Sequence, residues 1–140
     1  MPYTASLVIV YVRDTMRSAP FYRDLLGLPV QELSPHWAAF SAGGITLALH
    51  PHPSIPAVRD VARPWVVFGV DDPFAEYARL QAKGVVFTKA PYEVTGDAQT
   101  AGMSADFEDP DGNQYSIFGM VPRAKLPAGS PSACAPPPHA

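Results

Sequence analysis

Cysteine is nearly absent from this sequence. The chain has one, Cys134, and it lies close to the C-terminus. A single thiol can form neither an intrachain disulfide nor a thiolate metal cluster, because both need at least two sulfur atoms. A disulfide framework and a cysteine-based zinc site are therefore excluded within one chain.

Runs of basic residues and long apolar stretches are also missing. The net charge is -3, and the sequence contains no cluster of basic residues. Both features argue against nucleic acid and against an anionic membrane surface as partners. No segment approaches the roughly 18 apolar residues that span a bilayer. The first residues, MPYTASLVIVYVRD, have neither the basic start nor the cleavage site of a signal peptide. We therefore expect no nucleic-acid or membrane partner and a cytoplasmic location.

Apolar residues are plentiful, and they are unevenly distributed. They make up 47% of 140 residues, enough to bury the core of one domain. From Val121 onward the chain is rich in proline and poor in large apolar residues, so it cannot bury enough surface to offset its ordering entropy. We predict a domain over residues 1–120 and a disordered tail over 121–140. Cys134 and His139 in that tail are not expected to bind a metal.

The predicted domain repeats one pattern. SLVIVYVRDTMRSAPFYRDLLGLPV and WVVFGVDDPFAEYARLQAKGVVF each indicate a strand, a helix, a glycine stop and a new strand. In the second copy Asp72 is a predicted N-cap, with Pro73 at the first helical position and Gly84 after the helix. In the first copy Pro20 would interrupt a helix that began at Asp14, so we predict a loose turn there and a helix capped by Ser18.

Each copy ends in a strand, a glycine turn and a strand. WAAFSAGGITLALH and MSADFEDPDGNQYSIF show this pattern, so each copy reads β-α-β-β-β. The second copy is longer by roughly ten residues, and the polar stretch APYEVTGDAQTAG is a candidate lid that would hold the insertion. The predicted fold is α+β, with modules at about 5–52 and 63–120 whose curved sheets enclose a shared cavity.

These features resemble the vicinal oxygen chelate superfamily, which includes glyoxalase I, extradiol dioxygenases, fosfomycin resistance enzymes and bleomycin resistance proteins. The resemblance is carried by the paired modules, FYRDLLGL, VFGVDD and DPDGN, and it covers about residues 5 to 120. It implies the two-module fold. It says less about activity, because one fold hosts many chemistries.

The resemblance also implies where metal ligands would lie in a metal enzyme of the superfamily. The equivalent positions here are Leu7, Ala48, Trp65 and Ser116. Leucine, alanine and tryptophan cannot coordinate a divalent cation, and serine is a poor ligand without carboxylates or imidazoles beside it. The neighbouring positions supply no His or carboxylate either. We therefore predict no metal site and no cofactor. In this respect the protein is closest in character to the metal-free bleomycin-resistance-like members.

Strand alternation predicts which side chains share a face with these positions. The predicted ligand-binding residues are Leu7, Ile9, Tyr11, Trp37, Thr46, Ala48, His50, Trp65, Val67, Gln114, Ser116 and Phe118. Apolar and aromatic side chains with a small number of polar groups among them are typical of small-molecule sites. Aromatic residues on strands are also common in cores, and this reading stays open for Tyr11 and Phe118. Trp65 is the residue most expected to contact a ligand.

Two functional classes follow. The first is metal-independent binding of a small aromatic or planar molecule, such as an antibiotic or metabolite, by a homodimer like those the resemblance implies. The second is an enzyme, a lyase, isomerase or dioxygenase, in which His50, Tyr11 or Ser116 does acid-base work or a displaced metal site acts. The HPHP segment allows a metal at His50 and His52, with His36 or a distant carboxylate as third ligand. Loss of the ligand positions favours binding without chemistry.

Overall fold

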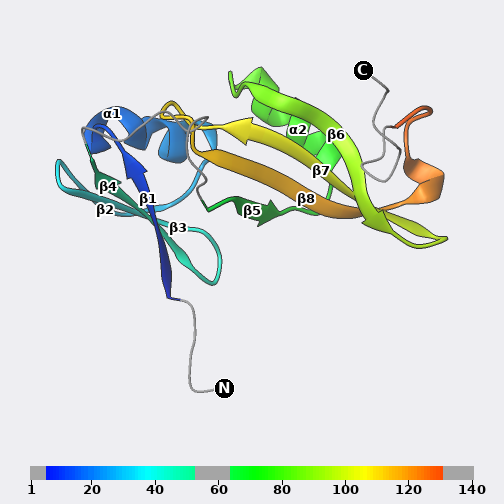
Figure 1. Ribbon diagram of the computed structural model, residues 1–140, viewed down its shortest axis with the longest axis horizontal. Coiled ribbons are helices and arrows are strands. Elements are labelled where there is room, and N and C mark those ends of the chain that lie inside the picture. Colours follow the sequence, from blue (N-terminus) through cyan, green and yellow to red (C-terminus); the bar gives the residue numbers. More distant parts are fainter. Residues whose placement is uncertain (1–5, 53–63, 131–140) are drawn as a thin grey trace. The chain divides into compact units, whose positions relative to one another are not determined.

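The computed structural model describes residues 6–52 and 64–130, and the chain divides into two units (Figure 1). The first unit holds the first module together with the turn at residues 109–113. Its elements are β1 (Leu7–Val12), α1 (Thr15–Pro20), the π-helical turn η1 (Phe21–Leu25), β2 (Val30–Ser34), β3 (Trp37–Ser41) and β4 (Thr46–Pro51). The predicted β-α-β-β-β order is confirmed in this unit.

The first helix differs from the prediction. Helix α1 begins directly after Asp14, whose carboxylate accepts hydrogen bonds from the backbone N–H groups of Met16 and Arg17. Pro20 lies inside the helical stretch instead of preceding it. Proline removes one backbone donor and crowds the preceding turn, yet the helical stretch continues past Pro20 as the π-helical turn at Phe21–Leu25. The predicted loose turn and Ser18 cap were therefore wrong.

The first sheet has the strand order β1-β4-β3-β2, with β1 parallel to β4. One face carries the helical segment, where Tyr22 stacks on Phe40 at 5.5 Å above buried Leu47 and Leu49. The turn at 109–113 is also held in this unit. Asp109 accepts hydrogen bonds from the Tyr22 hydroxyl at 2.6 Å and from two backbone N–H groups within its own turn.

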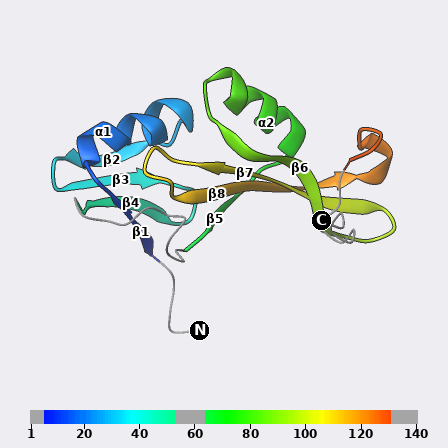
Figure 2. The ribbon, with the colours of Figure 1, turned by 45° about the horizontal axis from the view of Figure 1, so that its top comes forward.

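The second unit repeats the order with a shorter first strand and three longer strands after the helix. Its elements are β5 (Val66–Gly69), α2 (Pro73–Ala82), β6 (Phe87–Gly96), β7 (Thr100–Glu108), β8 (Gln114–Pro122) and the 3-10 turn η3 (Arg123–Lys125). The strand order is β5-β8-β7-β6, and α2 lies over one face of this sheet (Figure 2). The predicted cap is confirmed, since Asp72 accepts from the N–H groups of Phe74 and Ala75. Gly84 has φ +100°, as the predicted stop requires.

The predicted lid is not a loop. Residues 90–102 fall within β6 and β7, which pair in an antiparallel hairpin that turns at Asp97. The extra residues therefore lengthen this hairpin: β6 has 10 residues and β7 has 9, against 5 each in β2 and β3. The segment reads as a loop because it is polar and contains two glycines, Gly96 and Gly102, whereas its residues pair in strands with an irregular register.

The two faces of the second sheet differ in character. Tyr77 of α2 contacts Phe87, and Phe107 and Tyr115 stack at 5.6 Å to form the core beneath the helix. The side chains that alternate with Phe107 and Tyr115 along β7 and β8, among them Asp106 and Ser116, point to the opposite, open face.

Strand β8 continues past the predicted domain boundary at residue 120, and Val121 is buried. In the described part of the chain, none of the helices has the length and apolar character needed to cross a membrane.

Candidate functional site on the open face of the second sheet

The open face of the second sheet carries a buried polar cluster. Strand register sets Ser116 of β8 opposite Asp106 of β7 on one side and Val67 of β5 on the other. Asp106 and Ser116 are buried, with 6% and 3% of their surface exposed. Burying a carboxylate is costly unless hydrogen bonds satisfy it. The cluster is therefore built with specific partners.

Those partners form a connected chain of hydrogen bonds. The Trp65 indole N–H donates to Ser116 Oγ at 2.7 Å, and the Ser116 hydroxyl donates to Asp106 Oδ1 at the same distance. The Tyr92 hydroxyl donates to Asp106 Oδ2 at 2.9 Å, and Ser104 makes a longer contact of 3.4 Å to Oδ1. Hydroxyl groups from β6, β7 and β8 thus hold the Asp106 carboxylate, and Trp65, which precedes β5, is connected to it through Ser116. Side chains held this way are preorganised.

Tyr92 stays protonated in this cluster. Burial raises the pKa of its phenol above the usual value, and the hydrogen bond to Asp106 and the charge of that carboxylate raise it further. The phenol therefore acts as a donor at neutral pH and is unsuited to the role of base. The ammonium group of Lys89 lies 3.7 Å from the centre of the Tyr92 ring, a cation-π contact.

The predicted site residues of the second unit lie on this same face. Trp65 is 50% exposed and Val67 is 55% exposed, so both present apolar surface beside the buried cluster. Phe118 is half-buried, and its ring passes over Gly102, where an added Cβ would meet it at 2.9 Å. Gln114 begins β8 opposite Glu108. Two of the predicted aromatic residues, Trp65 and Phe118, thus lie on the same sheet face as the buried polar cluster.

The remaining predicted residues lie on the first sheet. Leu7, Ile9 and Tyr11 of β1 pair in register with Thr46, Ala48 and His50 of β4, respectively. All three β1 side chains are exposed, whereas Ala48 is buried.

Aromatic contacts join some of these side chains. The Tyr11 ring lies edge-on to His50 at 5.8 Å and to His52 at 5.6 Å, and Trp37 lies 6.4 Å from His50. The first sheet therefore brings a Tyr-His-Trp group together, and the second sheet brings together Trp65, Val67, Ser116 and their neighbours.

The positions at which the resemblance implies metal ligands do not fit a divalent cation. Leu7 and Ala48 have no donor atom, and the Trp65 ring nitrogen carries a hydrogen that it gives to Ser116. The Ser116 oxygen is already engaged by Trp65 and Asp106. The would-be ligands of the second unit thus bond to each other. Among the described residues, no three His, Cys, Asp or Glu side chains gather to hold a metal ion.

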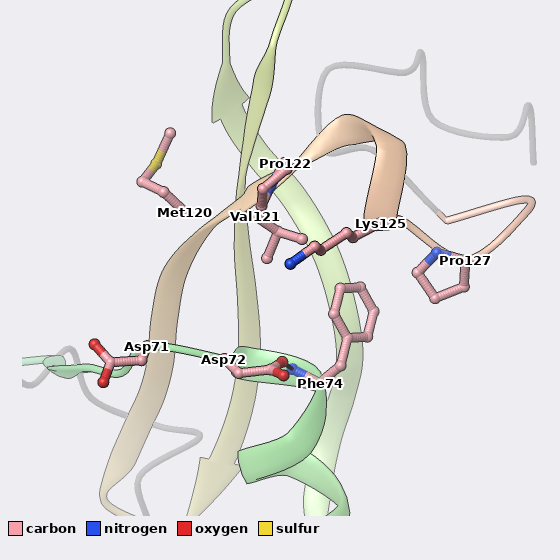
Figure 3. Close-up of a pocket in the computed structure, with 8 residues that line it drawn as sticks. All are labelled: Asp71, Asp72, Phe74, Met120, Val121, Pro122, Lys125 and Pro127. Atoms are coloured by element: carbon pink, nitrogen blue, oxygen red, sulfur yellow. Dashed lines mark hydrogen bonds between the residues drawn. The ribbon is translucent and has the colours of Figure 1, made fainter.

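A separate cavity of about 320 Å³ lies elsewhere in the second unit (Figure 3). It is lined by Asp71, Asp72, Phe74, Met120, Val121, Pro122, Lys125 and Pro127. Its volume is at the low end for ligand sites. The Asp72 carboxylate is committed to capping α2, and Lys125 is exposed. The polar cluster on the open sheet face, with its buried carboxylate, is the better-built candidate site.

Sequence reasoning missed Asp106, Ser104 and Tyr92. It placed Tyr92 in a lid and did not assign faces to the strand before the DPDGN turn. A signal was present, since Ser104 and Asp106 alternate with Met103, Ala105 and Phe107 in the period of a strand. Such alternation puts a carboxylate on the face opposite Phe107, and the turn then sets it beside Ser116.

Comparisons with known proteins agree with this architecture. Three solved structures have similar folds. A lactoylglutathione lyase from Agrobacterium tumefaciens has a TM-score of 0.65 at 21% identity, covering 84% of this chain and 94% of that one. A glyoxalase/bleomycin resistance protein/dioxygenase from Nocardioides has a TM-score of 0.64 at 22% identity, covering 94% and 89%. A protein from the mobile metagenome of V. Pseudocholerae has a TM-score of 0.64 at 27% identity, covering 85% and 95%.

A sequence search of curated proteins found no match. A family profile, by contrast, matches residues 4–117, which is most of the chain. The modules, their strand orders and this match lead to one assignment: the chain belongs to the Glyoxalase/Bleomycin resistance protein/Dioxygenase superfamily.

Proposed function

We propose that this protein binds a small planar or aromatic molecule without the help of a metal. The observation that carries the proposal is the state of Trp65. Its indole is half exposed, yet its N–H is fixed to buried Ser116 at 2.7 Å. An exposed aromatic ring that is held in place offers a ligand a stacking surface with little ordering cost. Val67 and Phe118 extend the apolar surface beside it.

The donor chemistry of the cluster supports binding over catalysis. Ser116 receives one hydrogen bond and gives another, so its proton and one of its two lone pairs are engaged. The Asp106 carboxylate, which would have to take the Ser116 proton as a general base, already accepts hydrogen bonds from Tyr92 and Ser104. Tyr92 is held in its protonated form. The close Ser116–Asp106 pair is nevertheless the feature that an acid-base enzyme would use, and it keeps that alternative open to test.

Binding is tested by fluorescence of single-tryptophan variants. The chain has two tryptophans, so Trp37→Phe leaves Trp65 as the reporter and Trp65→Phe leaves Trp37. A library of planar natural products is first screened by thermal shift, because a ligand that binds only the folded state raises the melting temperature. Hits should change Trp65 emission and leave Trp37 emission nearly unchanged. Trp65→Ala should weaken binding about tenfold or more, which corresponds to about 1.4 kcal/mol.

A second readout separates binding from turnover. Each hit is incubated with the protein and recovered, and its mass is compared before and after. Intact recovery together with a saturable Trp65 signal supports sequestration. Conversion of a hit, lost in Ser116→Ala, would replace binding by the enzyme alternative. Folded Trp65→Ala protein that binds every hit normally would contradict the site itself.

The proposal includes a homodimer, as the sequence resemblance implied, and a cytoplasmic location as a separate expectation. Sedimentation at micromolar concentration should then give about twice the chain mass of 15.0 kDa. Lys125→Ala, on the separate cavity of the second unit, is the control for location, because it lies outside the Asp106 cluster. It should leave the affinity of every hit unchanged.

A further inference from the structure

We infer that the ligand of the open face carries a positively charged nitrogen attached to its planar ring. This inference rests on the proposed function and names the class of molecule that the same site selects. Its basis is the carboxylate of Asp106, which is almost fully buried and is held by hydroxyl groups alone. None of the ion pairs among the described residues includes Asp106.

The hydroxyl partners satisfy the hydrogen-bonding capacity of Asp106, but they bring no opposite charge. An ionised aspartate is an acceptor only, and Ser116 and Tyr92 both donate to it. Its negative charge is in no ion pair, because the ammonium of Lys89, the register partner of Asp106 on β6, lies against the Tyr92 ring instead of the carboxylate. A cation that reaches this face gains more attraction here than at an exposed carboxylate.

The aromatic side chains of the cluster favour the same kind of group. The faces of Trp65 and Tyr92 attract cations through their ring quadrupoles. The Tyr92 ring already receives the ammonium of Lys89 at 3.7 Å, which shows that a cation is accepted at this position. Trp65, half exposed, is an aromatic surface beside the carboxylate that a ligand ring can cover. A planar ring on Trp65 with its cationic nitrogen toward Tyr92 satisfies both features at once.

The test uses three probes of one shape and different charge. 9-Aminoacridine is a planar cation at neutral pH, acridine is neutral, and acridine-9-carboxylate is an anion. Their dissociation constants are measured by probe fluorescence and by calorimetry at low and at physiological salt. We expect the cation to bind the wild-type protein at least tenfold more tightly than acridine, and the anion to bind least. The preference for the cation should shrink as salt is added.

Two variants locate the source of the preference. Asp106→Asn keeps the shape of the side chain and removes its charge, and it should bring the affinities for the cation and the neutral probe together. Glu108→Gln removes the same charge two residues along β7 and should change their ratio much less. Circular dichroism checks that both variants are folded. If Asp106→Asn fails to fold, the affinities of the three probes for the wild-type protein, and their dependence on salt, still test whether the site prefers a cation.

The outcomes separate this inference from the function beneath it. Equal binding of cation and neutral probe, both sensed by Trp65, overturns the inference and leaves planar-ligand binding standing. A cation preference that survives in folded Asp106→Asn also overturns it. If none of the probes binds and the wider library leaves Trp65 emission unchanged, the proposed function fails and this inference fails with it.

Discussion

The chain buries carboxylates in two different ways, and the contrast separates support from function. Asp109, in the turn held by the first unit, accepts hydrogen bonds from the backbone of Asp111 and Asn113 and from the side chains of Tyr22 and Asn113. Asp106, on the open face of the second sheet, is held by side-chain hydroxyls that can rotate. Backbone donors tie Asp109 to its turn, whereas Asp106 is held by side chains of the open sheet face that also position Trp65.

The surroundings of the two carboxylates differ in the same sense. Asp109 lies among the residues that close the first unit, beside Asp111, which accepts from the Ser18 hydroxyl at 2.6 Å and from the Arg13 N–H at 3.0 Å. Asp106 lies beside exposed Trp65. All of these acidic residues come from the second copy of the sequence pattern. Asp109 and Asp111 tie the 109–113 turn to the helical segment of the first unit, whereas Asp106 lies under an open aromatic surface of the second unit.

The largest expected effect is the loss of stability in Asp109→Asn. An amide can accept at one end only, so two donors that now reach Asp109 would face an NH₂ group instead of an oxygen. Both backbone N–H groups donate to Oδ1, whose place the amide oxygen can take, so the NH₂ group would face the Tyr22 hydroxyl and the Asn113 side-chain amide, which now donate to Oδ2. We expect a loss of about 3 kcal/mol in the free energy of unfolding, measured in urea. A loss below about 1 kcal/mol would show that the turn does not depend on this carboxylate.

A second prediction concerns how stability changes with pH. Burial raises the pKa of Asp109, against the hydrogen bonds of Asn113 and Tyr22 that lower it. A carboxyl with a raised folded pKa contributes stability that is present in full below its unfolded pKa, near 3.9, and is lost as pH rises through the folded value. The stability advantage of the wild type over Asp109→Asn should therefore be larger at pH 4 than at pH 7.

Asp97 supplies a control of opposite sign. The backbone N–H groups of Gln99 and Thr100 lower the pKa of Asp97, which begins the β6–β7 turn. Its contribution is therefore present above the unfolded pKa and is lost as pH falls through the folded value. The advantage of the wild type over Asp97→Asn should shrink on acidification in the same urea series. Parallel trends for the two variants would contradict the assigned causes.

A smaller effect on stability is expected for Asp106→Asn. The amide oxygen can keep accepting from Ser116, and the Tyr92 hydroxyl can rotate to accept from the new NH₂ group. We expect a loss below about 1 kcal/mol in the free energy of unfolding. Asp109→Asn in the same experiment is the matched comparison. If Asp106→Asn costs as much stability, the contrast between a supporting and a functional carboxylate is lost.

The fold was predictable from the sequence because its signals are local. Asp72 before Pro73 marks a helix start, and Gly84 marks its end with positive φ. Alternation and the DPDGN turn gave the paired strands in each copy. Pro20 misled because a proline inside a helix was treated as a break, whereas the chain absorbs it with a wider turn. The lid failed because polar residues on an exposed hairpin resemble those of a loop.

The candidate site was predictable only in part, for a geometric reason. Trp65 and Ser116 came from positions set by the resemblance, and the structure joins them by a hydrogen bond. Asp106 and Tyr92 depend on the register between β6, β7 and β8. That register includes shifts in the β6–β7 pairing, which a pattern of residue types does not encode. Whether the predicted residues of the first sheet share in ligand binding stays a prediction.

The smallest expected effect is that of metal ions, because we expect almost no metal retention and almost no change in the melting temperature. Trp65 and Ser116 form a hydrogen bond with each other where the family's metal enzymes would place ligands; the indole N–H has no lone pair to give, and a neutral serine hydroxyl is a poor ligand by itself. After dialysis against a chelator and reloading with zinc, nickel, manganese or iron, the protein should retain much less than one equivalent. Its melting temperature should hardly change, since bound metal would stabilise the folded state by mass action.

The first sheet offers the clearest way for this metal prediction to fail. His50 and His52 both contact the Tyr11 ring, and His50 Nδ1 lies 3.0 Å from the Pro51 carbonyl, which leaves Nε2 open in one tautomer. Stoichiometric retention that disappears in His50→Ala or His52→Ala would place a metal there and revive the enzyme reading. Retention that persists in both variants but disappears in Asp106→Asn would instead place the metal on the second sheet and overturn the description of that face as metal-free.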